Sequence, residues 1–120
     1  MRHSPAFLSL VDDAKSRVRE TSVQDAHACR RAGAHLIDVR EESEWAAGRA
    51  EGAEHLGKGV IERDIETAVP DKDAEIHLYC GGGYRSALVA DTLQRMGYTR
   101  VASVAGGWRA WNDAGLPVMK

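Results

Sequence analysis

The chain has 120 residues, 43% of them hydrophobic, and a formal net charge of -2 at neutral pH, values typical of one globular domain. Charges of both signs are interspersed, which argues against nucleic acid or an anionic membrane as the main partner. Two cysteines are too few for a disulfide framework, and no apolar run is long enough for a signal peptide or a membrane span, so we expect a cytoplasmic protein with reduced thiols.

Helices and strands alternate along the predicted chain. An amphipathic helix over residues 5–19 comes first, with Ser4 as N-cap and Pro5 at the first helical position. Strands are then predicted at 21–23, 34–40, 53–56, 75–80 and 100–104, and helices at 24–32, 43–47, 59–69, 86–96 and 107–114. Short apolar runs such as 34–40 are typical of buried parallel strands. The alternation predicts an α/β domain with a mainly parallel sheet covered by helices on both faces.

One loop stands out in this pattern. The stretch LYCGGGYRSALVA, residues 78–90, joins the strand predicted at 75–80 to the following helix. Ligands of parallel α/β sheets bind beyond the carboxyl ends of the strands, and Cys80 stands at such an end. The loop then contains Gly81, Gly82, Gly83, Tyr84, Arg85 and Ser86. We expect an exposed cysteine at the mouth of this loop.

The loop has the composition of an anion cradle. Three glycines let the backbone turn sharply and bring its N–H groups together, and the N-terminus of the next helix adds partial positive charge. These surroundings favour the thiolate form of Cys80, and Arg85 adds a fixed positive charge. An inert cysteine in a glycine turn is the simpler alternative. The order strand, cysteine, glycines, arginine, serine and helix favours a reactive thiol or a bound anion.

Two segments of the chain resemble single-domain rhodanese-like sulfurtransferases: LIDVREESEWAAGRAEGAEHL, residues 36–56, and LYCGGGYRSALVADTLQRMGYTRVASVAGGWRAW, residues 78–111. The motifs that match are Asp-Val-Arg, Cys-x-x-Gly-x-Arg-Ser after a strand, and Gly-Gly-Trp after the last strand. The resemblance implies a five-stranded parallel sheet with helices on both faces. It divides the chain into an N-terminal helical extension, 1–19, and a rhodanese-like domain, 20–120.

The resemblance also implies a mechanism. Cys80 would accept a sulfane sulfur from thiosulfate or a persulfide donor, and its persulfide would pass that sulfur to cyanide or a thiol. The backbone N–H groups of residues 81–86 would stabilise the negative persulfide. Arg85 would draw in the anionic donor and shape the loop. Ser86 is interpreted as the cap of the following helix.

Residues outside the loop are predicted to support it. Asp38 and Arg40 lie two apart, so both side chains point to one face of a regular strand, and a buried carboxylate such as Asp38 needs a partner. The resemblance implies that they form the floor of the active-site region, although a purely structural ion pair is at least as well supported. Gly106 and Gly107 are expected near the pocket.

Three departures from the family pattern affect the predicted site. The segment GRAEGA, residues 48–53, replaces a more apolar turn and leaves the shape of that rim open. The glycines at 81–83 leave Arg85 as the only charge in the loop, so a persulfide is an alternative natural donor to thiosulfate. Tyr84 stands at the loop tip, where it would shield the persulfide, meet a partner or face solvent.

Two other functions compete with sulfur transfer. A cysteine phosphatase or arsenate reductase also combines a cysteine, a backbone cradle and an arginine, but the phosphatases have five residues between Cys and Arg. Only four intervene between Cys80 and Arg85, and a smaller ring of N–H groups suits one sulfur atom better than a phosphoryl group. The second alternative is a binding or sulfur-carrier module with little turnover.

The predicted partners follow from the resemblance to sulfurtransferases. They are a small anionic sulfur donor and a thiol or cyanide acceptor, with a protein as an alternative sulfur acceptor, and no nucleic acid or membrane is expected. A monomer or weak dimer is expected, with no organic cofactor and no metal, because the five histidines show no ligand spacing. Cys29 is interpreted as a small, partly buried side chain and His77 as a structural residue.

Overall fold

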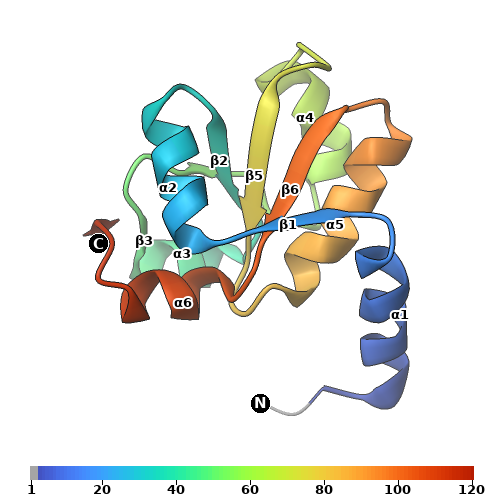
Figure 1. Cartoon of the computed structure of the whole chain (residues 1–120), viewed down its shortest axis with the longest axis horizontal. Coiled ribbons are helices and arrows are strands. Elements are labelled where there is room, and N and C mark those ends of the chain that lie inside the picture. The colour runs from blue at the N-terminus through green and yellow to red at the C-terminus, as the bar shows by residue number, and fades with distance from the viewer. Residues whose placement is uncertain (1–2) are drawn as a thin grey trace.

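The main sheet is parallel and has five strands in the order β1-β6-β5-β2-β4, as the computed structural model in Figure 1 shows. The structure describes residues 3–120. The strands are β1 (Arg19–Thr21), β2 (His35–Asp38), β4 (Glu54–His55), β5 (Glu75–Tyr79) and β6 (Arg100–Val104). Every pair of neighbours in this sheet is parallel. The predicted fold class is confirmed.

Helices cover both faces of the sheet. They are α1 (Pro5–Lys15), α2 (Val23–Arg31), α3 (Glu42–Ala47), α4 (Ile61–Ala68), α5 (Tyr84–Arg95) and α6 (Gly107–Asp113). Buried residues of α4 and α5 form one core cluster with the sheet, and those of α2 and α6 form the other. Helix α1 packs against α5 at the outside of the first layer.

Strand β5 shows why both faces must be covered. Ile76 and Leu78 belong to the core under α4 and α5, and Tyr79 belongs to the core under α2 and α6. Successive side chains of a strand point to opposite faces, so a strand that is buried along residues 76–79 needs helices on both sides. The same reasoning explains the short apolar runs by which the strands were predicted.

Several predicted boundaries shift in the structure. Helix α1 begins as predicted, with Ser4 accepting a hydrogen bond from the Phe7 N–H at 3.2 Å, but it ends at Lys15 rather than at residue 19. The first strand therefore lies at Arg19–Thr21 instead of 21–23. Helix α5 begins at Tyr84, two residues before the predicted start. These shifts are local, and they leave the order of elements unchanged.

A second, two-stranded sheet is absent from the prediction. It pairs β3 (Arg49–Ala50) antiparallel with β7 (Val118–Met119). Two-residue strands are too short to show a hydrophobic period, so only the return of the chain end to the 48–53 segment reveals them. This pairing gives that segment, whose shape the sequence left open, a defined conformation.

No helix among residues 3–120 is long and apolar enough to span a membrane.

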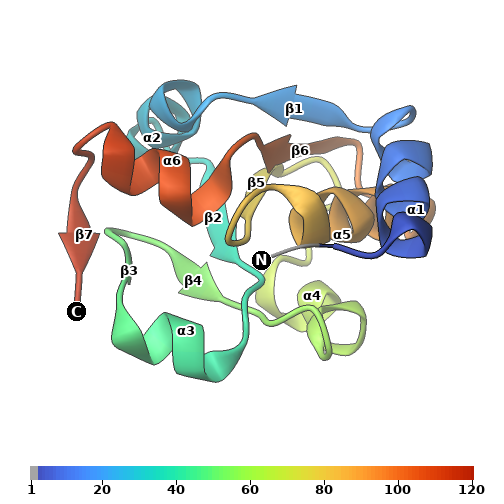
Figure 2. The same cartoon turned by 90° about the horizontal axis from the view of Figure 1, so that it is seen from below.

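The carboxyl ends of the strands meet at one edge, which Figure 2 views from below. The turn between β6 and α6 lies against the loop after β5. Trp108 N–H donates to the Cys80 carbonyl at 2.7 Å, and Arg109 N–H donates to the Gly81 carbonyl at 3.1 Å. Gly107 has φ +50°, and a Cβ on it would overlap the Cys80 carbonyl oxygen. Close approach of the two loops therefore requires glycine at this position.

We predict that Gly107→Ala destabilises the protein more than Gly115→Ala. Both glycines have positive φ, which costs a non-glycine residue roughly 1–2 kcal/mol, but nothing lies within 4 Å of a Cβ on Gly115. The overlap with the Cys80 carbonyl adds to that cost only at Gly107. Urea unfolding of both variants measures the difference, and equal destabilisation would contradict the proposed contact.

Candidate active site

The Cys80 sulfur lies inside the loop that follows β5. Its Sγ accepts hydrogen bonds from the backbone N–H groups of Gly83 at 3.1 Å and Ser86 at 3.4 Å. The residue is only 1% exposed. The prediction of an exposed cysteine is therefore wrong, because the loop folds back over the sulfur and the start of α5 closes beneath it. Backbone N–H groups converging on a sulfur are suited to hold negative charge there.

Gly83 makes this turn possible. It is the residue before α5 and has φ +98°, a conformation that glycine adopts without a side-chain clash. The turn points the Gly83 N–H at Sγ and lets α5 begin at Tyr84. The start of α5 then brings the Ser86 N–H, one of the helix's unpaired N-terminal donors, toward the same sulfur.

Ser86 does not cap the helix, which corrects the prediction. It lies inside the first turn of α5 and is fully buried. Its hydroxyl is 2.8 Å from the Ser103 hydroxyl on β6 and 3.5 Å from the Cys80 Sγ. Because α5 starts at Tyr84, the Ser86 side chain faces the sheet instead of the helix end. Ser86 and Ser103 thus form a polar floor beneath the sulfur.

Arg85 is paired with a carboxylate. Its guanidinium donates to both oxygens of Glu44 on α3, at 2.8 and 3.1 Å. Hydrogen bonding to Arg85 lowers the pKa of Glu44, and the same bond raises the pKa of Arg85. The guanidinium also lies against Gly81, where a Cβ would be 3.2 Å from Nη2. The pair joins α3 to the cysteine loop and offsets the positive charge predicted for that loop.

A cavity of about 950 Å³ opens over the loop. It is lined by His3, Ser4, Phe7, Glu41, Glu44, Cys80, Gly81, Gly82, Tyr84, Arg85, Gly106 and Arg109. The presence of Gly106 agrees with the prediction that the Gly-Gly turn borders the pocket. The cavity is large enough for a donor or acceptor of several non-hydrogen atoms above the sulfur.

Arg109 was not recognised from the sequence. It lies on α6, it is exposed, and its side chain makes no ion pair with the other described residues 3–120. The hydrogen bond from its N–H to Gly81 fixes its place beside the loop. The only sequence signal was its position two residues after Gly107, and that signal has meaning only once the two loops are known to touch.

Tyr84 contacts the N-terminal segment. The Tyr84 ring centroid is 4.6 Å from that of His3 and 6.4 Å from that of Phe7, and the Lys15 Nζ lies 5.3 Å from it. The three roles predicted for Tyr84 were shielding the persulfide, meeting a partner and facing solvent. None of them included packing against the first helix. The contact brings the start of α1 to the cavity, so the N-terminal helix forms one wall of the candidate site.

Asp38 and Arg40 form a buried ion pair. The Arg40 Nη2 donates to the Asp38 Oδ2 at 2.7 Å, and both residues are almost wholly buried. Burial disfavours the charge of Arg40, but the bond to Asp38 prevails and raises its pKa. Neither residue lines the cavity above Cys80. The structure therefore places this ion pair outside the lining of that cavity.

Arg40 connects three segments around that cavity. Its Nη2 donates to the Gly48 carbonyl at 2.7 Å, its own carbonyl lies 2.9 Å from the His55 Nε2, and its Cζ is 4.7 Å from the Trp108 ring centroid. A buried guanidinium with this many partners is held rigidly. Arg40 thus ties the 48–53 segment, strand β4 and helix α6 to the end of β2.

Comparison with known proteins agrees with this geometry. The family model described as a rhodanese-like domain matches residues 20–114. This chain belongs to the rhodanese-like domain family. Among curated relatives, thiosulfate sulfurtransferase PspE of Escherichia coli is 35% identical over 89 residues, which cover 74% of this chain and 82% of the relative. The putative sulfurtransferase YtwF of Bacillus subtilis is 40% identical over 83 residues, 69% of this chain and 78% of that protein.

Solved structures share this rhodanese-like fold along almost the whole chain. A protein of unknown function from Rhodopseudomonas palustris, described as a possible tyrosine phosphatase, aligns with a TM-score of 0.86 at 30% identity and covers 99% of both chains. A polysulfide-sulfur transferase homodimer from Wolinella succinogenes aligns with a TM-score of 0.82 at 26% identity, covering 95% of this chain and 87% of that one. Both alignments extend beyond the 20–114 family match.

We predict that Asp38→Asn lowers the free energy of unfolding by about 3–5 kcal/mol, the usual cost of leaving a buried charge without its partner. The substitution removes the carboxylate and leaves the Arg40 guanidinium buried. Asp64→Asn removes a carboxylate from an exposed arginine pair with Arg63 and is the matched control. Urea unfolding should show little change for the control, and equal effects in both variants would contradict a structural role for the buried pair.

Proposed function

We propose that this protein is a sulfurtransferase that carries a sulfane sulfur as a persulfide on Cys80. The observation on which the proposal depends is the convergence of the Gly83 and Ser86 N–H groups on Sγ, at 3.1 and 3.4 Å, within a rhodanese-like chain. These donors stabilise negative charge on sulfur without moving. The names of relatives such as thiosulfate sulfurtransferase PspE support the same activity.

The proposed reaction has two steps. In the first, the Cys80 thiolate attacks the outer sulfur of thiosulfate, the sulfur–sulfur bond of the donor breaks, and sulfite leaves with the bonding electron pair. In the second, cyanide or a thiolate attacks the terminal sulfur of the persulfide, and Cys80 leaves as thiolate. The cycle is balanced, because the sulfur passes from one nucleophile to another and no outside oxidant or reductant is required.

The residues of the cavity have different roles in this reaction. The N–H groups of the loop stabilise the thiolate and the persulfide in turn. Arg109 supplies positive charge for an anionic donor, while Arg85 is partly neutralised by Glu44. The Glu44 carboxylate also faces the cavity and repels an anion there. The balance of charge favours a weakly held anionic donor, which leaves an organic persulfide as the alternative to thiosulfate.

A second candidate function is hydrolysis of a phosphate monoester. The Rhodopseudomonas palustris neighbour, described as a possible tyrosine phosphatase, is the observation that favours it. Against it, four residues separate Cys80 from Arg85, where the cysteine phosphatases have five. The Glu44 carboxylate bound to Arg85 would also compete with a phosphoryl dianion. Release of phosphate from p-nitrophenyl phosphate by wild type, and not by Cys80→Ser, would favour the phosphatase.

We predict that the reduced protein gains the mass of one sulfur atom when incubated with thiosulfate, and that cyanide removes it as thiocyanate. Intact-mass spectrometry measures both steps. Cys80→Ser should gain no sulfur, and Cys29→Ser should gain as much as wild type, because Cys29 lies on α2 away from the loop.

A second donor, glutathione persulfide, tests which donor the protein prefers and whether it is an enzyme or a sulfur carrier. Labelling by this donor alone would make an organic persulfide the preferred donor. Labelling without discharge to cyanide or glutathione would favour the sulfur-carrier alternative. Absence of label from both donors, or equal labelling of Cys80→Ser, would refute the proposed function.

We predict that Glu44→Gln lowers the KM for thiosulfate by about twofold to fivefold, in line with the worth of one partly exposed ion pair. The change removes the repulsive carboxylate and frees Arg85, while the amide oxygen keeps an acceptor for the Glu41 N–H. Arg109→Gln should raise the KM by a similar factor. Steady-state thiocyanate formation measures both constants.

Glu62→Gln on the exposed side of α4 is the matched control, because it makes the same change of charge away from the cavity. Its KM should equal that of the wild type. If Glu44→Gln raised the KM, the ion pair would be required for donor binding, and the proposed role of Glu44 would be wrong.

A further inference from the structure

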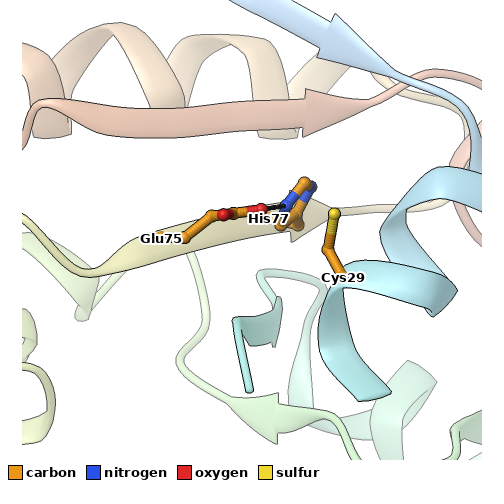
Figure 3. Close-up of side chains that lie close together, drawn as sticks. All are labelled: Cys29, Glu75 and His77. Atoms are coloured by element: carbon orange, nitrogen blue, oxygen red, sulfur yellow. Dashed lines mark hydrogen bonds and ion pairs between the residues drawn. The ribbon is translucent and has the colours of Figure 1, made fainter. Parts of the chain in front are cut away.

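Three side chains with metal-binding atoms meet between helix α2 and strand β5. They are Cys29 from α2 and Glu75 and His77 from β5 (Figure 3). One ligand atom from each, the Cys29 Sγ, a Glu75 carboxylate oxygen and a His77 ring nitrogen, lies within 4.8 Å of the other two. The sequence predicted no metal site, because the histidines show no ligand spacing, and Cys29 is 46 residues before Glu75, too far for a short motif to join them.

The two-residue period of strand β5 and the packing of helix α2 bring these groups together. Glu75 and His77 are two residues apart on a strand, so their side chains point to the same face of the sheet. That face is covered by α2, and Cys29 lies on the side of α2 that faces the strand, as Figure 3 shows. The group is therefore a product of the packing of α2 on β5.

His77 is held in one orientation. It is 1% exposed. Its Nδ1 lies 3.3 Å from the Thr21 hydroxyl on β1, and its Nε2 lies 2.7 Å from the Glu75 Oε2. A histidine ligand typically has its other ring nitrogen fixed by a hydrogen bond to a neighbouring group. Thr21 fills that role, which leaves Nε2 directed toward Glu75 and Cys29.

We propose that Cys29, Glu75 and His77 form a binding site for a divalent transition-metal ion, with zinc the ion best matched to the ligands. A thiolate sulfur, an imidazole nitrogen and a carboxylate oxygen are the donors that Zn²⁺ takes in proteins. Calcium and magnesium prefer oxygen donors alone. Three protein ligands leave a fourth tetrahedral position for water.

The spacing of the ligand atoms is close to what zinc needs. Zinc bonds of about 2.0–2.3 Å in tetrahedral geometry place donor atoms about 3.3–3.6 Å apart. The observed limit of 4.8 Å between donors requires any pair of them to approach by no more than about 1.2–1.5 Å. Cys29 and Glu75 are both partly exposed, so their side chains can rotate, and water and ions can reach them.

The charges around the group suit one divalent cation. A Cys29 thiolate and the Glu75 carboxylate together carry two negative charges for a divalent cation, and the paired Arg100 guanidinium offsets part of the charge of Glu75. Arg100 donates to the Glu75 Oε1 at 2.8 Å, and Oε2, which lies 2.7 Å from the His77 Nε2, is the oxygen directed toward the other ligands. Glu75 would therefore bind the ion through one oxygen.

The same residues also satisfy one another without an ion. Hydrogen bonding with Glu75 raises the pKa of the Cys29 thiol, and hydrogen bonding with His77 lowers the pKa of Glu75. A metal ion would replace these hydrogen bonds and displace the thiol proton. A simple hydrogen-bonded cluster is thus the alternative that an experiment must separate from a metal site.

The proposed metal site is separate from the candidate active site. Glu75 begins β5 and Cys80 follows its end. His77, the nearer ligand, lies three residues before Cys80, about 10 Å along an extended chain, and Cys80 packs in the core on the other face of the sheet, so Cys80 cannot share the ion. A bound ion would join α2 to β5 and stabilise the fold, and it would take no part in the proposed sulfur transfer.

The test is a cobalt titration of untagged Cys80→Ser protein, a background that removes the only other cysteine. Cobalt(II) substitutes for zinc and reports its ligands in the visible and near-ultraviolet spectrum. We expect one equivalent to bind with a sulfur-to-cobalt charge-transfer band, and zinc to displace it. Zinc should also raise the Tm of this protein.

Two further variants and one control complete the test. Adding Cys29→Ser should abolish the charge-transfer band and the zinc-dependent rise in Tm, and adding His77→Gln should abolish cobalt binding. Adding His35→Gln should change nothing, although His35 also lies 2.8 Å from a carboxylate, that of Glu54. Circular dichroism shows whether the buried His77→Gln variant is folded. If that variant is unfolded, the result for Cys29→Ser alone decides between a metal site and a hydrogen-bonded cluster.

The proposal is overturned if the Cys80→Ser protein binds no cobalt. It is also overturned if cobalt binds with the same spectrum and affinity after Cys29→Ser. Neither result bears on sulfur transfer, since both are measured without Cys80.

Discussion

The loop after β5 depends on its contact with the turn after β6. Two backbone hydrogen bonds, from the N–H groups of Trp108 and Arg109, hold the carbonyls of Cys80 and Gly81. With its carbonyls fixed from outside, the loop directs its own N–H groups inward to the Cys80 sulfur. The approach leaves no space for a Cβ on Gly107. These two backbone hydrogen bonds thereby help to fix the N–H groups that surround the Cys80 sulfur.

Charge is balanced differently above and below this loop. Below it, Asp38 and Arg40 are fully paired and excluded from water, so they set the positions of neighbouring segments and do not attract a ligand. Above it, the Arg85–Glu44 pair is about one-third exposed, and Arg109 makes no ion pair among residues 3–120. Solvent screens the exposed charges, in keeping with the brief binding of an anion in the proposed sulfur transfer.

The N-terminal helix is part of the site, although the family match begins after it. Helix α1 packs on α5, whose first turn carries Tyr84 and Arg85. The contacts of His3 and Phe7 with Tyr84 place the beginning of α1 at the rim of the cavity. A segment that adds nothing to the sheet therefore forms part of the wall of the cavity.

The sequence by itself determined the α/β class, the start of the first helix at Ser4 and Pro5, and the loop with Cys80 at the end of a strand. These features depend on local periodicity, caps and glycines, which a single chain displays directly. Only the tertiary structure decided that Cys80 is buried, that Ser86 faces Ser103, that Arg85 pairs with Glu44, and that Cys29 lies beside His77. Each of these contacts joins residues from different elements or depends on where α5 begins. The strand order β1-β6-β5-β2-β4 brings distant segments together, and the spacing of residues along the chain does not encode that order.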